Sequence, residues 1–315
     1  MHRSPFARFT NRETIALKTS LWLASMLLIF LVVGGDVING PSSLDYATLK
    51  QNGFYLWVAL FLCTAWVFIK RSDIIQAMHY SDAHARWTFF GILLLVTSVP
   101  SLYYVAASPN ELGVGLFTAF FTIVGTFAVF FGRASKIPLM LLGLFGVAVF
   151  FPMLLESAFS APFSRFTAVL SISTLQVSGM PITLSGVTVT LSSMMGYDIL
   201  TKVDARCAGS DSLAIFLVMF CLMFMDRRPR TNALIGLLIF GVVGTYFQNV
   251  VRLLLLFAAG YHYGSGALWT VHDYAGYILF PFWFLIFAVV YLRYAERPHT
   301  PSKRRITSAE QITKL

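Results

Sequence analysis

The stretch that decides the fold is residues 232–259, NALIGLLIFGVVGTYFQNVVRLLLLFAA, in which Arg252 is the only charged residue. About 20 predominantly apolar residues suffice for a helix to cross a bilayer, so this stretch predicts a transmembrane helix. The whole chain shares its character: of 315 residues, 57% are hydrophobic and 12% are charged, with a mean hydropathy of +0.73. Soluble domains carry about 25% charged residues, so the composition excludes a water-soluble globule. Three scattered cysteines, Cys63, Cys207 and Cys221, exclude a disulfide framework and a zinc ribbon.

Seven further segments resemble this one in length and hydrophobicity. We therefore expect an all-α polytopic membrane protein with about eight transmembrane helices. The expected spans are residues 17–35, 54–69, 87–106, 113–132, 137–157, 211–226, 232–259 and 273–293.

Positive charge is distributed unevenly between the two sets of connecting loops. Of the 23 Lys and Arg residues, 18 lie in the two tails and in alternate loops, and five, including Arg252, lie elsewhere. Loops rich in Lys and Arg remain cytoplasmic, so the pattern predicts cytoplasmic termini and an even number of spans. The net charge of +9 therefore reports membrane orientation and requires no nucleic-acid partner. The 18 residues are Arg3, Arg8, Arg12, Lys18, Lys70, Arg71, Arg86, Arg133, Lys136, Arg227, Arg228, Arg230, Arg293, Arg297, Lys303, Arg304, Arg305 and Lys314.

One external connection, residues 158–210 between the fifth and sixth spans, is much longer than the others. Residues 163–178 mix apolar and hydroxyl side chains, which favours an amphipathic helix at the membrane interface. Residues 182–204 are rich in Thr, Val, Ser and Gly with partial alternation, which favours short strands or a hairpin. Long ordered loops are often functional, and a surface cap over the bundle is the alternative.

The chain divides on this basis into three regions of one integrated membrane domain. Residues 1–157 form a five-helix region with a cytoplasmic N-terminus, residues 158–295 combine the external segment with three helices, and residues 296–315 form a cytoplasmic tail.

Arg252 is the one ionisable residue that the orientation pattern does not explain. It lies about 10 Å below the external end of its span, and ionisable residues at such positions are functional candidates. Its head group could instead snorkel to the outer surface. Asn249 is three residues earlier on the same helix face, which favours a polar pocket within the bundle.

Cys207 lies in ArgCysAlaGlySerAsp, just before the sixth span and therefore at the outer interface. Arg206 supplies a nearby cation, Gly209 permits close backbone approach, and Ser210 with Asp211 is expected to cap the following helix. A cation and a helix N-terminus both favour a reactive thiolate. The alternative is a small buried hydrophobe, which is the interpretation we favour for the two cysteines within apolar helices.

His272 precedes the last span, also at the outer interface. Histidine is the side chain best suited to general acid–base chemistry near neutral pH. The alternative is an interfacial histidine in an aromatic belt with Trp269, Tyr274 and Tyr277, and His262 is a weaker candidate for the same role. Three spans thus place a cysteine, an arginine and a histidine at one external depth, as a nucleophile, an oxyanion stabiliser and an acid–base would require.

These residues resemble the motifs of the exosortase/archaeosortase family of polytopic membrane cysteine transpeptidases. The resemblance covers residues 163–293, and the earlier spans share only their hydrophobicity. One departure is Ala208, where the family commonly has serine. The matching residues are Cys207-Ala208-Gly209, Asn249-Val250-Val251-Arg252, and His272 followed by Asp273 and Ala275-Gly276.

The resemblance implies an enzyme that removes a C-terminal tripartite sorting signal from exported proteins at the outer face of the plasma membrane. Cys207 would form a thioester with the substrate, His272 would transfer protons, and Arg252 would stabilise the oxyanion. Asn249, Gly209, Ser210 and Asp273 would support these three, with membrane lipid as surroundings and with no cofactor or metal.

Other classes of protein remain alternatives. An anion-binding multispan transporter would also hold an intramembrane arginine, although its polar residues belong near the midplane. A serine protease acting through Ser210 or Ser212 lacks a supporting motif, and a thiol oxidoreductase would need a CxxC pair that the sequence does not contain. A non-catalytic membrane assembly factor is the remaining alternative.

Overall fold

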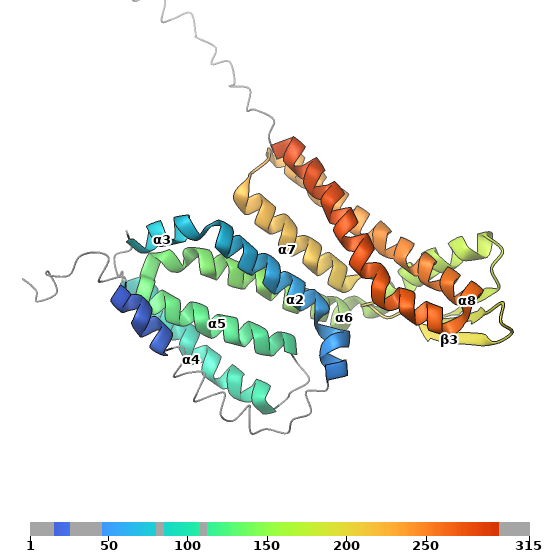
Figure 1. Cartoon of the computed structure of the whole chain (residues 1–315), viewed down its shortest axis with the longest axis horizontal. Coiled ribbons are helices and arrows are strands. Elements are labelled where there is room, and N and C mark those ends of the chain that lie inside the picture. The colour runs from blue at the N-terminus through green and yellow to red at the C-terminus, as the bar shows by residue number, and fades with distance from the viewer. Residues whose placement is uncertain (1–15, 26–45, 80–84, 108–111, 296–315) are drawn as a thin grey trace, which may run out of the picture.

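The structure is a computed structural model that describes residues 16–25, 46–79, 85–107 and 112–295. Long helices dominate it, and one small sheet interrupts them (Figure 1). Residues 16–25 are helical, so the first expected span is only partly described, and the expected tail 296–315 lies outside the described residues. The remaining elements are α2 (Tyr46–Ile69), α3 (Arg71–His79), α4 (Ala85–Ala107), α5 (Leu112–Phe131), the 3₁₀ turn η2 (Gly132–Ser135), α6 (Lys136–Val177), β1 (Ile182–Ser185), β2 (Thr188–Ser192), β3 (Asp198–Lys202), α7 (Ser210–Asp226) and α8 (Thr231–Ala295).

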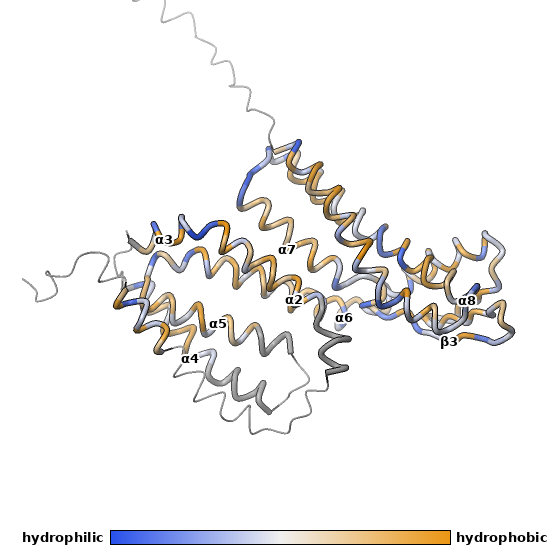
Figure 2. Tube along the Cα trace, in the orientation of Figure 1, coloured by the Kyte–Doolittle hydropathy of each residue, from blue (hydrophilic) through white to orange (hydrophobic). Residues whose placement is uncertain are grey.

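Hydrophobic residues dominate most of the described helices, and polar residues gather in α3 and in the turn between α7 and α8 (Figure 2). Two helical stretches, Phe117–Val177 and Thr231–Ala295, are long and apolar enough to cross a membrane, and Tyr55–Ile69 and Arg86–Ser98 are shorter apolar helices. The expected mostly helical fold is therefore confirmed. The count of eight spans remains a prediction.

Helix α8 is a hairpin of two arms that contains both of the last two expected spans. Its 65 residues are interrupted at Gly264, whose φ of +82° is a conformation that favours glycine. The tyrosine hydroxyl of Tyr197 accepts a hydrogen bond from the backbone N–H of Ser265 at 3.1 Å. A Cβ at Gly264 would lie 2.0 Å from this hydroxyl, so a side chain there would also displace the ring of Tyr197.

Helix α6 runs for 42 residues without a break, through Pro152 and Pro162. At 1.5 Å per residue it is about 63 Å long, roughly twice the thickness of a bilayer core. A helix is confirmed over residues 163–177, but it is the continuation of α6 rather than an element of its own, and its position at a membrane interface remains a prediction. Its apolar face, with Ala168 and Ile172, packs against the sheet and α8.

The sheet confirms the expectation of short strands over residues 182–204. Its strands are antiparallel in the order β1-β2-β3. Val189, Leu191 and Ile199 point to one face and pack against Leu256 and Phe257 of α8. We refer to residues 158–209 and 253–271, which share this core, as the sheet lobe.

The loops that carry most positive charge meet at the opposite end of the bundle from the sheet lobe. The Lys70 ammonium lies 2.7 Å from the Asp226 carboxylate, which joins the end of α2 to the end of α7. The Tyr291 hydroxyl, near the end of α8, donates to the carbonyl of Arg227 at 2.8 Å. Two connections and the end of α8, all of which sequence analysis assigns to one side of the membrane, therefore share one end of the fold.

Candidate active site

A tight turn, residues 203–209, presents Cys207 between the sheet and α7. Val203 donates to the carbonyl of Val187 at 2.9 Å, which ties the start of the turn to β2. The Asp204 carboxylate then accepts the backbone N–H of Cys207 at 2.7 Å, and its carbonyl accepts the N–H of Ala208 at 2.9 Å. An aspartate that bonds the backbone a few residues ahead is a typical turn-forming device. The turn is thus built by Asp204.

Gly209 lets α8 approach this turn closely. Its φ is +106°, and a Cβ there would lie 2.9 Å from Cγ of Asn249. In the space that glycine leaves, the Asn249 amide donates to the carbonyl of Cys207 at 2.9 Å. Both backbone polar groups of Cys207 are therefore held by side chains, one from the turn and one from α8.

Arg252 lies one helical turn beyond Asn249, and its guanidinium donates to the backbone carbonyl of His272 at 3.0 Å. This bond joins the two arms of α8, so the head group turns into the hairpin rather than snorkelling outward. The imidazole of His272 is partly buried, with its ring centroid 5.4 Å from that of Trp269. Arg252 interacts electrostatically with Cys207 and Asp273, and it bonds His272 through the backbone carbonyl, so the structure brings these four residues to one region of the fold.

The thiol of Cys207 is neutral in this arrangement. Burial raises its pKa to about 12, and the charge of Asp204 and a hydrogen bond to that carboxylate act in the same direction. Arg252 opposes the shift but does not offset it. The expectation of a resting thiolate is therefore wrong, because burial outweighs the cation and the helix end.

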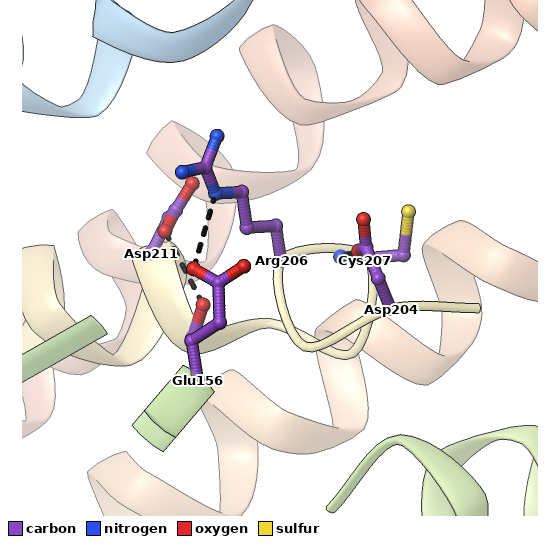
Figure 3. Close-up of polar contacts among 6 residues, drawn as sticks. Glu156, Asp204, Arg206, Cys207 and Asp211 are labelled. Carbon is purple, nitrogen blue, oxygen red and sulfur yellow. Dashed lines mark hydrogen bonds and ion pairs between the residues drawn. The ribbon is translucent and has the colours of Figure 1, made fainter. Parts of the chain in front are cut away.

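Two expected neighbours of Cys207 have other roles. Arg206 points away from the thiol, with its guanidinium 3.7 Å from the carboxylate of Glu156 on α6 (Figure 3). The cation that acts on the thiol is Arg252. Ser210 does not cap α7: the N-cap is Gly209, and the Ser210 hydroxyl bonds the Asp211 carboxylate at 3.3 Å.

The competing candidates from sequence analysis are distant from Cys207 or buried. His262 is near the tip of the α8 hairpin, with its ring 4.9 Å from that of Tyr261. Cys63 is buried against α6, and Ser212 is buried in α7. Within the described ranges no group of three His, Cys, Asp or Glu side chains could hold a metal ion.

Asp204 is the site residue that sequence analysis missed. The spacing Asp204-x-x-Cys207 could have indicated this role, because an aspartate side chain commonly accepts a hydrogen bond from the backbone N–H a few residues ahead of it. Arg206 was considered instead because it is the charged residue next to Cys207.

The fold defines a class: a protein of long apolar helices with a small sheet lobe at one end of its bundle, where Cys207 lies in the turn between the sheet and α7. The family model described as transmembrane exosortase (Exosortase_EpsH) matches residues 48–289, and the chain belongs to this family. Members are in general membrane cysteine transpeptidases that act on exported proteins. The match begins at residue 48, well before residue 163, so the helices from α2 onward lie within the family region, whereas the first expected span, 17–35, lies outside it. No curated protein and no solved structure matches the chain significantly.

Proposed function

We propose that this protein is a membrane cysteine transpeptidase or protease that removes a C-terminal sorting signal from exported proteins through a thioester on Cys207. One observation carries the proposal: Arg252, on the first arm of α8, interacts electrostatically with Cys207 and donates a hydrogen bond to the backbone carbonyl of His272 on the second arm. A nucleophile, a cation and an acid–base group in one site are what acyl transfer needs.

The first half-reaction begins from the neutral thiol. The imidazole of His272 accepts the Sγ proton as Sγ attacks the carbonyl carbon of the scissile peptide. Arg252 stabilises the oxyanion of the tetrahedral intermediate, and a donor in this role contributes about 10²–10³-fold in rate. The C–N bond then breaks, and the imidazolium protonates the leaving amine.

The second half-reaction releases the product. Water or an amine acceptor gives a proton to His272 and attacks the thioester carbon, with Arg252 again facing the oxyanion. The C–S bond breaks, and the proton returns to the sulfur. Asn249 and Asp204 hold Cys207 in place throughout, because they bond its carbonyl and its N–H at 2.9 and 2.7 Å.

The site faces the outside of the plasma membrane in this proposal, and both termini are cytoplasmic. The positive-inside rule supports this orientation. So does the separation of the Lys70–Asp226 end of the bundle from the sheet lobe.

The test is co-expression with an exported reporter that carries a short recognition segment, an apolar helix and a basic cluster at its C-terminus. We expect the mass of the signal to be lost with the wild type and retained with Cys207→Ala, Arg252→Gln and His272→Ala. The matched control is Cys221→Ala, whose thiol lies on α7 and takes no part. Signal removal at the wild-type rate by Cys207→Ala would refute the assignment.

If the protein were a transporter or an assembly factor, the wild type would not remove the signal from the reporter. Neither function needs the thiol, so Cys207→Ala would leave that function intact. The mass added to the reporter also separates hydrolysis from transfer to an acceptor.

A further inference from the structure

Strand β3 is an edge of the sheet, and its outward side is open. Ser193 donates to the carbonyl of Tyr197 at 3.0 Å, and Val203 donates to that of Val187 at 2.9 Å. Because bonding alternates along an antiparallel strand, residues 197, 199, 201 and 203 bond β2, and residues 198, 200 and 202 point their N–H and C=O away. Across the described residues, no backbone group bonds the outward side at these three positions.

The middle of this edge also exposes an apolar side chain. Leu200 is 71% exposed, between the exposed Asp198 and Lys202. An open edge strand is a template for pairing with another extended chain. Charged residues at both ends discourage indiscriminate pairing and leave the centre available.

The strand leads from the tip of the sheet lobe toward Cys207. The turn before β3 is fixed at the tip, where Met194 donates to the carbonyl of Tyr261 at 3.0 Å. Cys207 is fixed to Asn249, which is twelve residues earlier on α8, or about 18 Å lower along the helix. Cys207 follows Lys202 after only five residues.

We propose that the open edge of β3 binds the extended segment of the substrate that precedes its membrane helix. The inference rests on the proposed function. A substrate whose body is outside and whose C-terminal helix is in the membrane runs from the tip toward the bundle, as β3 does. The segment therefore adds as a parallel fourth strand, with main-chain hydrogen bonds at residues 198, 200 and 202 and its scissile bond at Cys207. Leu200 contacts the side chains of the segment.

The first test replaces Leu200 with proline. Proline removes the outward-pointing N–H of residue 200 and leaves the hydrogen bonds between β3 and β2 in place. Edge strands tolerate proline at such positions. Leu200→Pro is compared with Leu200→Ala, which keeps the N–H. The control is Leu184→Pro, whose N–H points outward from the opposite edge, β1.

With the C-terminal reporter as substrate, we expect Leu200→Pro to raise KM about 3–10-fold beyond Leu200→Ala, as loss of a backbone hydrogen bond implies, with kcat nearly unchanged. Leu184→Pro should leave KM close to the wild-type value. Equal KM values for the proline and alanine variants at position 200 would overturn the inference.

The second test does not depend on tolerance of proline. A photoreactive benzoylphenylalanine replaces Leu200 in a Cys207→Ala background, which retains uncleaved reporter. The control places the photoreactive residue at Thr183 on β1. Thr190 of β2 pairs with both Thr183 and Leu200, so position 183 lies two strand spacings, or about 10 Å, from position 200. We expect an adduct with the reporter from position 200 and not from 183.

The outcomes separate the two proposals. If the wild type cleaves the reporter and position 200 gives no adduct, or gives only a dimer of this chain, the β3 assignment is wrong while the proposed function stands. If the wild type does not cleave the reporter, the proposed function itself fails.

Discussion

The reactivity of Cys207 gives the most direct test of the site. With a pKa of about 12, its thiolate fraction at pH 8 is about 10⁻⁴, against roughly 0.2 for an ordinary thiol of pKa about 8.5. A more basic thiolate is a better nucleophile by about 40-fold over this interval. The net expectation is alkylation about 50-fold slower than that of an ordinary cysteine, rising about tenfold per pH unit up to pH 10 without a plateau.

The assay labels protein that carries Cys63→Ala and Cys221→Ala with iodoacetamide, and the labelled fraction is measured by mass spectrometry over time. Asp204→Asn removes the negative charge that raises the pKa, so the thiolate fraction and the labelling rate should increase. Arg252→Gln removes the opposing cation, so labelling should become slower. A plateau between pH 6 and 9 in the wild type, or slower labelling in Asp204→Asn, would refute the electrostatic reasoning.

Three further substitutions follow from the contacts of the site. Gly209→Ala places a methyl group 2.9 Å from Asn249 at a φ of +106°. We expect the unfolding free energy to fall by about 1–3 kcal/mol, measured by thermal melting, and most signal removal to be lost, measured by the mass of the reporter. Arg206→Gln removes a half-exposed ion pair with Glu156, worth less than about 1 kcal/mol, so reporter processing should persist. Loss of processing in this variant would contradict the assignment of Arg206 away from the thiol. Gly264→Ala strains the hairpin at a φ of +82° and should lower the melting temperature, and an unchanged value would contradict the close fit at the tip.

Much of the fold could be predicted because hydrophobic length and turn chemistry act locally. The expected span 211–226 differs from α7 by one residue at its start, and the strands lie within 182–204. The helix over 163–178 was predicted, but not its continuity with the span 137–157. Pro162 lies between the two segments, and the packing of Ala168 and Ile172 that holds the long helix in place depends on contacts with distant strands.

In the candidate site, too, the local features could be predicted from the sequence and the long-range contacts could not. The alignment of Asn249 with Arg252 comes from helix periodicity, so the sequence contains it. The direction of Arg206 depends on Glu156, fifty residues earlier, and only the packed structure reveals it. Burial of the thiol likewise arises from tertiary packing, which is why a resting thiolate was expected and a neutral thiol was found.

The two-armed form of α8 has a consequence for biosynthesis. Arg252 and His272 are only 20 residues apart and face each other across one hairpin, so their pairing is local and forms readily once both arms are inserted. Cys207 precedes this hairpin in the chain, and its carbonyl finds its partner on Asn249 only after the first arm is in place. Cys207 is therefore translated before Arg252 and His272, and the proposed site becomes complete only when the second arm of α8 has been inserted. On this proposal, a nascent chain exposes no assembled site to neighbouring proteins during insertion.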